Sequence, residues 1–165
     1  MKQTPDGPFC LGALALSLAA LFTACQSTPT QTAAELKSLQ GYWEGDGSGG
    51  KCSITITGNS LYYYGRTDFW FKTTFTLPAG TDPQQLLATI KDCSDCSQPE
   101  NSSTGKVVPA IFKIEGGKLT LAADQGSGKQ PTAFPSDLNS PVARYDLKKV
   151  QRITNHPQPN EPKTP

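Results

Sequence analysis

The sequence predicts an all-β fold, a single small antiparallel up-and-down barrel of about eight strands. From Leu39 onward, apolar and polar residues alternate in short segments, which is the period of a half-buried strand. The chain holds 15 glycines and 14 prolines in 165 residues, a composition that suits strands joined by tight turns. Closing such a series of hairpins into a barrel removes the exposed edges of the sheet.

The expected strands follow one another with short turns between them. The clearest is 51–57, where Cys52, Ile54 and Ile56 fall on one face and hydroxyl residues on the other. Residues 85–91 contain good helix formers, but strands flank them on both sides, so we expect a strand there as well. The full set of expected strands is 41–46, 51–57, 61–64, 69–77, 85–91, 107–115, 118–123 and 142–150.

The N-terminal region, residues 1–24, is typical of a bacterial lipoprotein signal peptide. Its apolar run, Phe9 to Phe22, would span only about 21 Å as a helix, which is too short for a bilayer core of about 30 Å. The residues Phe-Thr-Ala-Cys that end at Cys25 resemble a lipobox, whose cysteine becomes the acylated first residue of the mature chain. We therefore expect lipidation of Cys25. The alternative is an ordinary signal peptide cleaved just before it.

This anchor implies an exported protein attached to the cell envelope. Gln26 after the cysteine resembles the outer-membrane sorting pattern, so we expect the domain to face the periplasm from the outer membrane. Residues 25–38 are polar and predict a flexible tether, and residues 39–150 form the barrel domain. Residues 151–165 end in "NHPQPNEPKTP", which has four prolines, so we expect a disordered tail.

Gly41-Tyr42-Trp43, at the start of the first strand, resembles the Gly-x-Trp signature of the lipocalin (calycin) superfamily. The resemblance implies a lipocalin-like barrel whose floor is closed by Trp43, stacked against a basic side chain of the last strand. On this chain that side chain would be Arg144 or Lys148, through a cation–π contact.

Residues 39–150 also resemble an uncharacterised small bacterial domain family of the planctomycete type. The similarity lies in "LQGYW", "DPQQLLATI" and "IFKIEGGKLTLAADQGSGKQPTAF". The chain departs from that family at Gln130, where arginine is usual, and in the insert 92–105. Because the family has no settled activity, the resemblance implies a fold and a domain extent rather than a function.

Three cysteines lie in the expected mature domain. Export permits disulfides, and we expect Cys93 and Cys96 to pair and staple a long loop while Cys52 stays on the inward face of its strand. A zinc site would need a further ligand, and the single histidine, His156, lies in the Pro-rich tail. We therefore expect no metal and no cofactor.

The chain carries little that indicates catalysis or nucleic-acid binding. The expected barrel has no histidine, and no Gly-x-Ser-x-Gly or Walker-type loop occurs, so we expect no catalytic residues and no enzyme activity. The formal net charge is +1, which provides no electrostatic basis for binding nucleic acid. The membrane, through the lipid anchor, is the expected partner, and the sequence identifies no protein partner.

Aromatic residues gather in the third and fourth expected strands. One interpretation is that they line a cavity for a small apolar or amphipathic ligand, and the alternative is that they fill the core of a solid barrel. A hollow interior would favour ligand binding. A filled interior would favour a protein-interaction or inhibitor-type module acting through loops 92–105 or 124–141. The residues expected to line a cavity are Tyr62, Tyr64, Phe69, Phe71 and Phe112.

Overall fold

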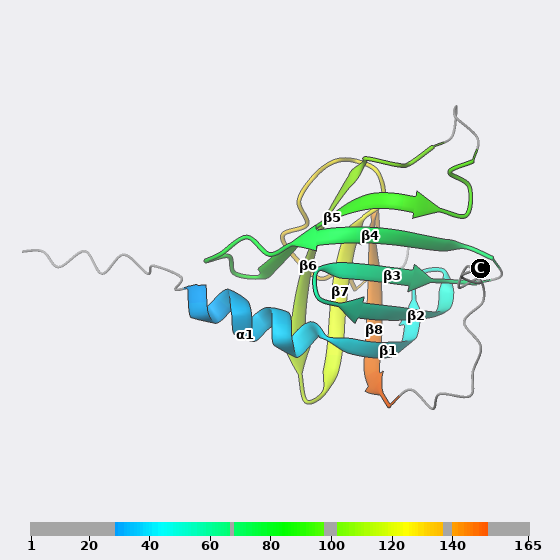
Figure 1. Ribbon diagram of the computed structural model, residues 1–165. Helices are drawn as coiled ribbons and strands as arrows, with labels where there is room; N and C mark the ends of the chain where they lie inside the picture. Colours follow the sequence, from blue (N-terminus) through cyan, green and yellow to red (C-terminus); the bar gives the residue numbers. More distant parts are fainter. Residues whose placement is uncertain (1–28, 67, 98–101, 137–139, 152–165) are drawn as a thin grey trace, which may run out of the picture.

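The computed structural model describes residues 29–66, 68–97, 102–136 and 140–151 (Figure 1). These residues form a closed barrel of eight antiparallel strands, each hydrogen-bonded to the next in sequence order, with β8 returning to β1. One short helix precedes the barrel. The predicted all-β barrel is therefore confirmed. The predicted signal peptide, Cys25 and most of the C-terminal tail lie outside the described residues.

Each expected strand is present, with ends that differ from the prediction by at most two residues. Residues 84–93, with their ambiguous propensity, form a strand because they pair on both sides with neighbouring strands. The strands are β1 Gly41–Gly47, β2 Gly50–Thr57, β3 Ser60–Tyr64, β4 Trp70–Thr76, β5 Gln84–Cys93, β6 Val107–Glu115, β7 Lys118–Asp124 and β8 Val142–Val150.

The helix α1, Pro29–Leu39, corrects the prediction of a flexible tether over residues 29–38; residues 25–28 of the predicted tether lie outside the described residues. Its C-terminal part is attached to the barrel, because Leu39 is fully buried in the core and Leu36 packs against it. Gln40 binds the β2–β3 turn by accepting from the Gly58 N–H (2.6 Å) and donating to the Gly58 carbonyl (3.0 Å). Leu36 and Leu39 are three residues apart and lie on one face of the helix, so packing of this face against the core stabilises it. The polar composition of the segment did not indicate a helix.

The core occupies the inside of the barrel. Alternate residues of all eight strands point inward, and the largest of them are almost completely buried. These side chains form one cluster that runs from α1 to the far end of the barrel, so the interior is filled with protein atoms. The inward side chains below 2% exposure are Trp43, Ile54, Leu86, Phe112, Leu119 and Leu147.

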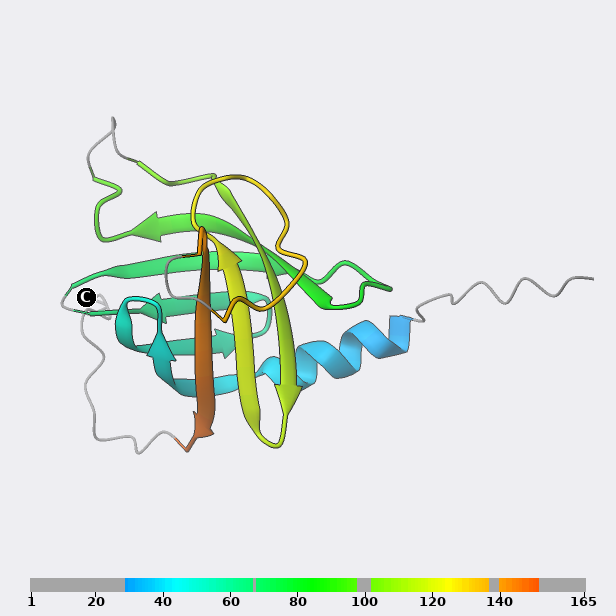
Figure 2. The ribbon, with the colours of Figure 1, turned by 180° about the vertical axis from the view of Figure 1, so that it is seen from behind.

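A segment that we call the strap, residues 125–136, crosses the outer face of β6, β7 and β8 (Figure 2). Gln130 Nε2 donates to the Ala110 carbonyl at 2.9 Å, and Pro131 is buried. The strap accounts for the complete burial of Ile111 and Ala122, which lie on the outward side of their strands. One outer wall of the barrel is thus covered, whereas the outer faces of β1 to β4 are not covered by the strap.

At Gly45 the backbone of β8 leaves no room for a side chain on β1. A Cβ atom there would overlap the backbone oxygen of Asp146 and lie 2.9 Å from the Cα of Leu147. Because backbone atoms of a closed barrel cannot move aside cheaply, we expect Gly45→Ala to lower the free energy of unfolding by about 1–3 kcal/mol. Urea denaturation measures this. Gly49→Ala is the matched control, since its Cβ would meet no atom within 4 Å, and an equal loss in both variants would contradict the argument.

Candidate functional site

The two ends of the barrel differ in what they can do. The closed end holds α1 and the β2–β3 and β6–β7 turns. The open end holds the loops β1–β2, β3–β4, β5–β6 and β7–β8. At the closed end Trp43 is 1% exposed, and its Nε1 donates to the Leu39 carbonyl at 2.8 Å. The Trp43 side chain and α1 therefore close this end of the barrel.

The basic partner of Trp43 is Lys149, whose Nζ lies 5.2 Å from the centre of the indole ring. The prediction of Arg144 or Lys148 in this role is wrong. Trp43 pairs directly with Lys149 across the β1–β8 ladder, whereas Lys148 points to the opposite face and Arg144 lies five residues away, near the open end. The register of β8, which sequence alternation leaves undecided by one residue, makes this choice.

Arg144 instead attaches the strap to β8. Its Nη1 donates to the Pro135 carbonyl at 3.1 Å, and its Nε donates to Asp146 Oδ2 at 2.8 Å. Hydrogen bonds from Arg144 hold the pKa of the Asp146 carboxyl below its usual range. The role of Arg144 is therefore to position a loop, and it has no part in closing the floor of the barrel.

Four aromatic residues meet at the inner side of the open end, and we call them the open-end cluster: Tyr63, Phe69, Phe71 and Tyr145. The ring centres of Tyr63 and Tyr145 are 5.6 Å apart, and those of Phe69 and Phe71 are 4.9 Å apart, both pairs edge to face. Phe69 is 42% exposed, so the cluster reaches the surface. The cluster lies at the open end of the packed core, against which Tyr63 and Tyr145 pack.

The sequence-predicted cavity residues are only partly brought together. Phe69 and Phe71 belong to the open-end cluster, whereas Phe112 is buried deep in the core at 1% exposure. The prediction that Tyr62 and Tyr64 line the interior is wrong, since both point outward and the intervening Tyr63 points inward. In a run of three tyrosines, composition does not reveal which parity faces the core. Tyr145, which pairs with the inward Leu121, was missed and could have been found from the alternation in β8.

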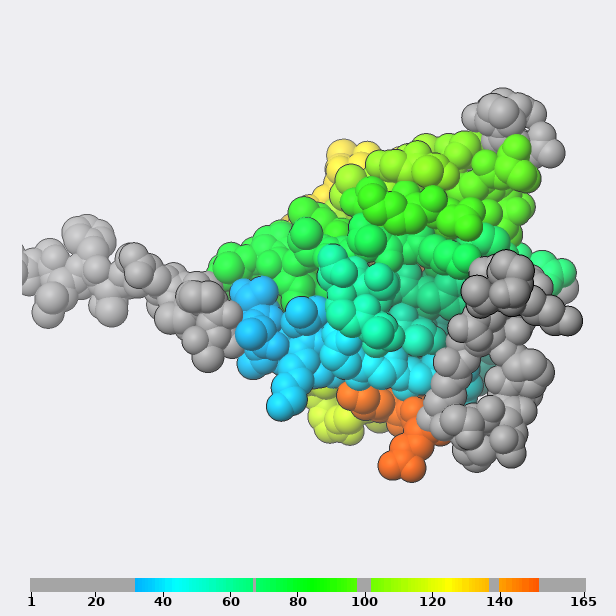
Figure 3. All heavy atoms as spheres, in the orientation of Figure 1, coloured from blue at the N-terminus to red at the C-terminus, as the bar shows by residue number. Residues whose placement is uncertain are grey.

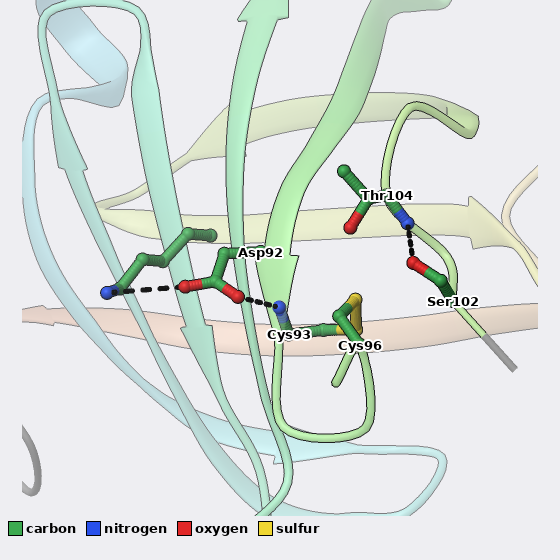
Figure 4. Close-up of a disulfide and its surroundings, with 6 residues drawn as sticks. Asp92, Cys93, Cys96, Ser102 and Thr104 are labelled. Carbon is green, nitrogen blue, oxygen red and sulfur yellow. Dashed lines mark hydrogen bonds and ion pairs between the residues drawn. A yellow bond between two sulfur atoms is a disulfide. The ribbon is translucent and has the colours of Figure 1, made fainter. Parts of the chain in front are cut away.

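Three cysteines lie next to the open-end cluster. Cys93 and Cys96 form the predicted disulfide at the start of the β5–β6 loop (Figure 4). The Cys93 N–H donates to Asp92 Oδ1 at 3.0 Å, and Asp92 Oδ2 forms an ion pair with Lys72 Nζ at 3.8 Å. Cys52 is a buried free thiol on the inward face, as predicted. Burial raises the pKa of Cys52 to about 11, so the thiol stays protonated at neutral pH and is a poor nucleophile.

The loops at the open end are held by short-range hydrogen bonds. In the β3–β4 loop, the Gly65 N–H donates to the Phe69 carbonyl at 2.8 Å. After β7, the Asp124 carboxylate accepts from the backbone N–H groups of Gly126 (3.0 Å) and Gly128 (2.8 Å) and from the Ser127 hydroxyl. Burial alone would raise the pKa of Asp124, but these hydrogen bonds hold it below its usual range. Together with the disulfide, these hydrogen bonds stabilise the described parts of the open-end loops.

Across 29–66, 68–97, 102–136 and 140–151, no group of three His, Cys, Asp or Glu side chains is placed to hold a metal ion. Within the same ranges, no helix has the length and apolar character needed to cross a bilayer.

Comparison with known proteins adds no relative to this picture, since no protein-family model, curated protein or solved structure matches the chain.

Proposed function

We propose that this chain is a lipid-anchored protein of the bacterial envelope whose barrel is a non-enzymatic interaction module that contacts a protein partner through its open end. The observation that carries the proposal is the filled interior. Trp43, Phe112 and Leu147 occupy the space in which a hollow barrel would hold a ligand, so binding surface is available at the ends and on the walls.

Two further features favour the open end over the closed end. Phe69 presents an apolar ring at 42% exposure, a feature enriched at interfaces, and the neighbouring Phe71 pairs with Cys93 of the disulfide-closed turn. A turn closed by a disulfide loses little conformational entropy on binding. The closed end faces α1, which leads back to the predicted anchor at Cys25, so a domain attached there directs its open end away from the membrane.

The anchor itself is proposed from the lipobox-like sequence that ends at Cys25 and from the short apolar run before it. We also propose that the chain belongs to the planctomycete-type domain family that it resembles. Its proposed location is the outer membrane, with the domain facing the periplasm.

Site-specific photocrosslinking in living cells tests the partner proposal. A photoreactive amino acid at Asp95, which is exposed in the disulfide-closed turn, is expected to give one discrete protein adduct on gel electrophoresis. The same amino acid at Asn59, in the closed-end β2–β3 turn, is the matched control and should give none. Phe69→Ala should reduce the Asp95 adduct about fivefold or more, since truncating an aromatic anchor typically costs about 1 kcal/mol or more. Equal adducts at both positions, or none at Asp95, would contradict the proposal.

A second candidate function is favoured by the open-end cluster itself. Its four rings form an apolar group that also carries the phenol hydroxyls of Tyr63 and Tyr145, which suits the binding of one acyl chain or a similar amphipathic molecule. Displacement of a fluorescent fatty acid measures this. Saturable binding at micromolar concentration that is lost in Phe71→Ala would support the ligand function over the partner function, and its absence would remove it.

A further inference from the structure

The Cys93–Cys96 bridge closes an exposed turn at the end of β5, and its two cysteines differ in access. Cys93 is 6% exposed and pairs with Phe71 across the β4–β5 ladder, whereas Cys96 is half-buried. The described parts of the β5–β6 loop lie at the surface, in green at the upper right of Figure 3. We propose that Cys96 is a site of reversible covalent modification by an external thiol, with Cys93 as the resolving cysteine. The site depends neither on the lipid anchor nor on the partner function.

Backbone hydrogen bonds hold this turn independently of the bridge. The Cys96 N–H donates to the Cys93 carbonyl at 3.2 Å, which is the hydrogen bond of a tight turn, and the Ser94 N–H donates to the Trp70 carbonyl at 3.1 Å. Cys93 also keeps its place in the β4–β5 ladder opposite Phe71. Opening the sulfur–sulfur bond therefore leaves β5 in place and keeps the two cysteines within one turn of each other, where they can pair again.

The bridge is weakly coupled to folding because its cysteines are only three residues apart. In the chain-entropy model, a bridge over so short a loop makes reduction about 20-fold less favourable in the folded chain than in the unfolded chain. For a bridge that closes a loop of about 100 residues, the same model gives a factor of about 1,000 or more. The fold therefore gives Cys93–Cys96 little of the protection that a long-range structural disulfide receives, and an accessible bridge of this kind suits thiol exchange.

The exchange step balances without a further oxidant or reductant. The thiolate of an external thiol attacks Cys96 Sγ, a bond forms between these two sulfur atoms, and the Cys93–Cys96 bond breaks with its electron pair on Cys93 Sγ. Cys93 then takes up, through solvent, the proton that the external thiol lost. The step is reversed when Cys93 Sγ attacks the mixed disulfide at Cys96 and releases the external thiol, which restores the bridge.

Burial distinguishes Cys96 from the two other cysteines of the barrel. Cys52 is 8% exposed, and burial raises its pKa to about 11, so it is an enclosed and protonated thiol that does not suit exchange. Cys93 is buried to a similar extent, at 6% exposure, which leaves Cys96 as the sulfur that an external thiol reaches first. The modification is therefore expected at one position of the three.

Titration of the detergent-solubilised full-length chain with mixtures of glutathione and glutathione disulfide tests the site. Acid quenching and peptide mass spectrometry locate the mixed disulfide, while circular dichroism reports on the fold. We expect glutathione to reduce the bridge in the folded barrel, with the mixed disulfide about tenfold or more as abundant on Cys96 as on Cys93. The same titration in urea is the matched control, and the reduction constant of the unfolded chain should exceed that of the folded chain by about 20-fold at most.

Two serine variants separate the roles of the two cysteines. Cys93→Ser removes the resolving thiol, so its mixed disulfide with glutathione should accumulate about tenfold or more above the wild-type level. Cys96→Ser is the matched counterpart, because it leaves one thiol in the same turn at the buried position, and it should react with glutathione disulfide about tenfold or more slowly than Cys93→Ser. In cells, an adduct of Cys93→Ser that joins it to a second protein assigns the reactant to a protein thiol. An adduct at the size of the single chain assigns it to a small thiol, and both results support the site.

Three results would overturn this proposal. The first is a bridge that glutathione leaves intact until urea unfolds the barrel. The second is a mixed disulfide that forms on Cys93 as often as on Cys96. The third is an equal rate of adduct formation by the two serine variants. The first two are measured on the wild type, so they hold whether or not the variants fold.

Discussion

Replacing Trp43 by alanine is expected to lower the free energy of unfolding by about 3–5 kcal/mol, a large share of the stability of a domain of this size. The indole is 1% exposed, it donates to the Leu39 carbonyl at 2.8 Å, and it carries the Lys149 ammonium 5.2 Å above its ring. The variant therefore opens a cavity beneath α1, leaves a buried carbonyl unpaired and removes a cation–π contact. Urea denaturation followed by circular dichroism measures the loss.

Two further variants separate these contributions. Trp43→Phe keeps a ring beneath Lys149 and loses the hydrogen bond to Leu39, so it should destabilise by clearly less than alanine. Trp70→Ala removes the other tryptophan, which is half-buried on the outer wall, and should cost at most about 1 kcal/mol. If Trp43→Ala lowered the free energy of unfolding no more than Trp70→Ala does, the Trp43 side chain would not be the residue that closes this end of the barrel.

Cys25→Ser is expected to abolish fatty-acid labelling and to release the protein from the membrane fraction. The proposed anchor depends on the acylated sulfur and amino terminus of this one residue, and a serine hydroxyl does not take its place in lipoprotein processing. The expected effect is a complete loss, because a domain without its acyl chains has no comparable membrane affinity. Labelling of cells with radioactive palmitate, followed by fractionation, measures both results.

Cys10→Ser is the matched control, since Cys10 is the other cysteine of the N-terminal region. It should leave labelling and fractionation unchanged. If the wild type were unlabelled, or if Cys25→Ser were labelled like the wild type, the anchor would be wrong. The barrel would stand, because its strands lie between residues 41 and 150.

The strands were predictable because alternation of apolar and polar residues is a local property. In β2, the inward set Cys52, Ile54 and Ile56 differs so clearly from its polar neighbours that the face toward the core is readable from the sequence. Alternation did not predict which face of β3 points inward at Tyr62, Tyr63 and Tyr64. These residues are chemically alike, and only pairing with Ile54 and Phe71 shows that the middle one points inward.

The site was less predictable than the fold, since its parts come together through long-range pairing. Lys149, and not Arg144, lies on Trp43 because β8 closes on β1 in one particular register. The Cys93–Cys96 bridge was predictable because its partners are only three residues apart, so that a single turn brings them within reach of each other.

The sequence by itself determined the number and order of the strands, the local disulfide and the inward position of Cys52, since each depends on residues close together in the chain. Only the tertiary structure decided that 29–39 is a helix, that the interior is filled and that the strap buries Ile111. It also decided that Tyr62 and Trp70 share the outer wall. Each of these depends on which surfaces meet when the barrel closes, and closure is set by packing between distant residues that no local pattern encodes.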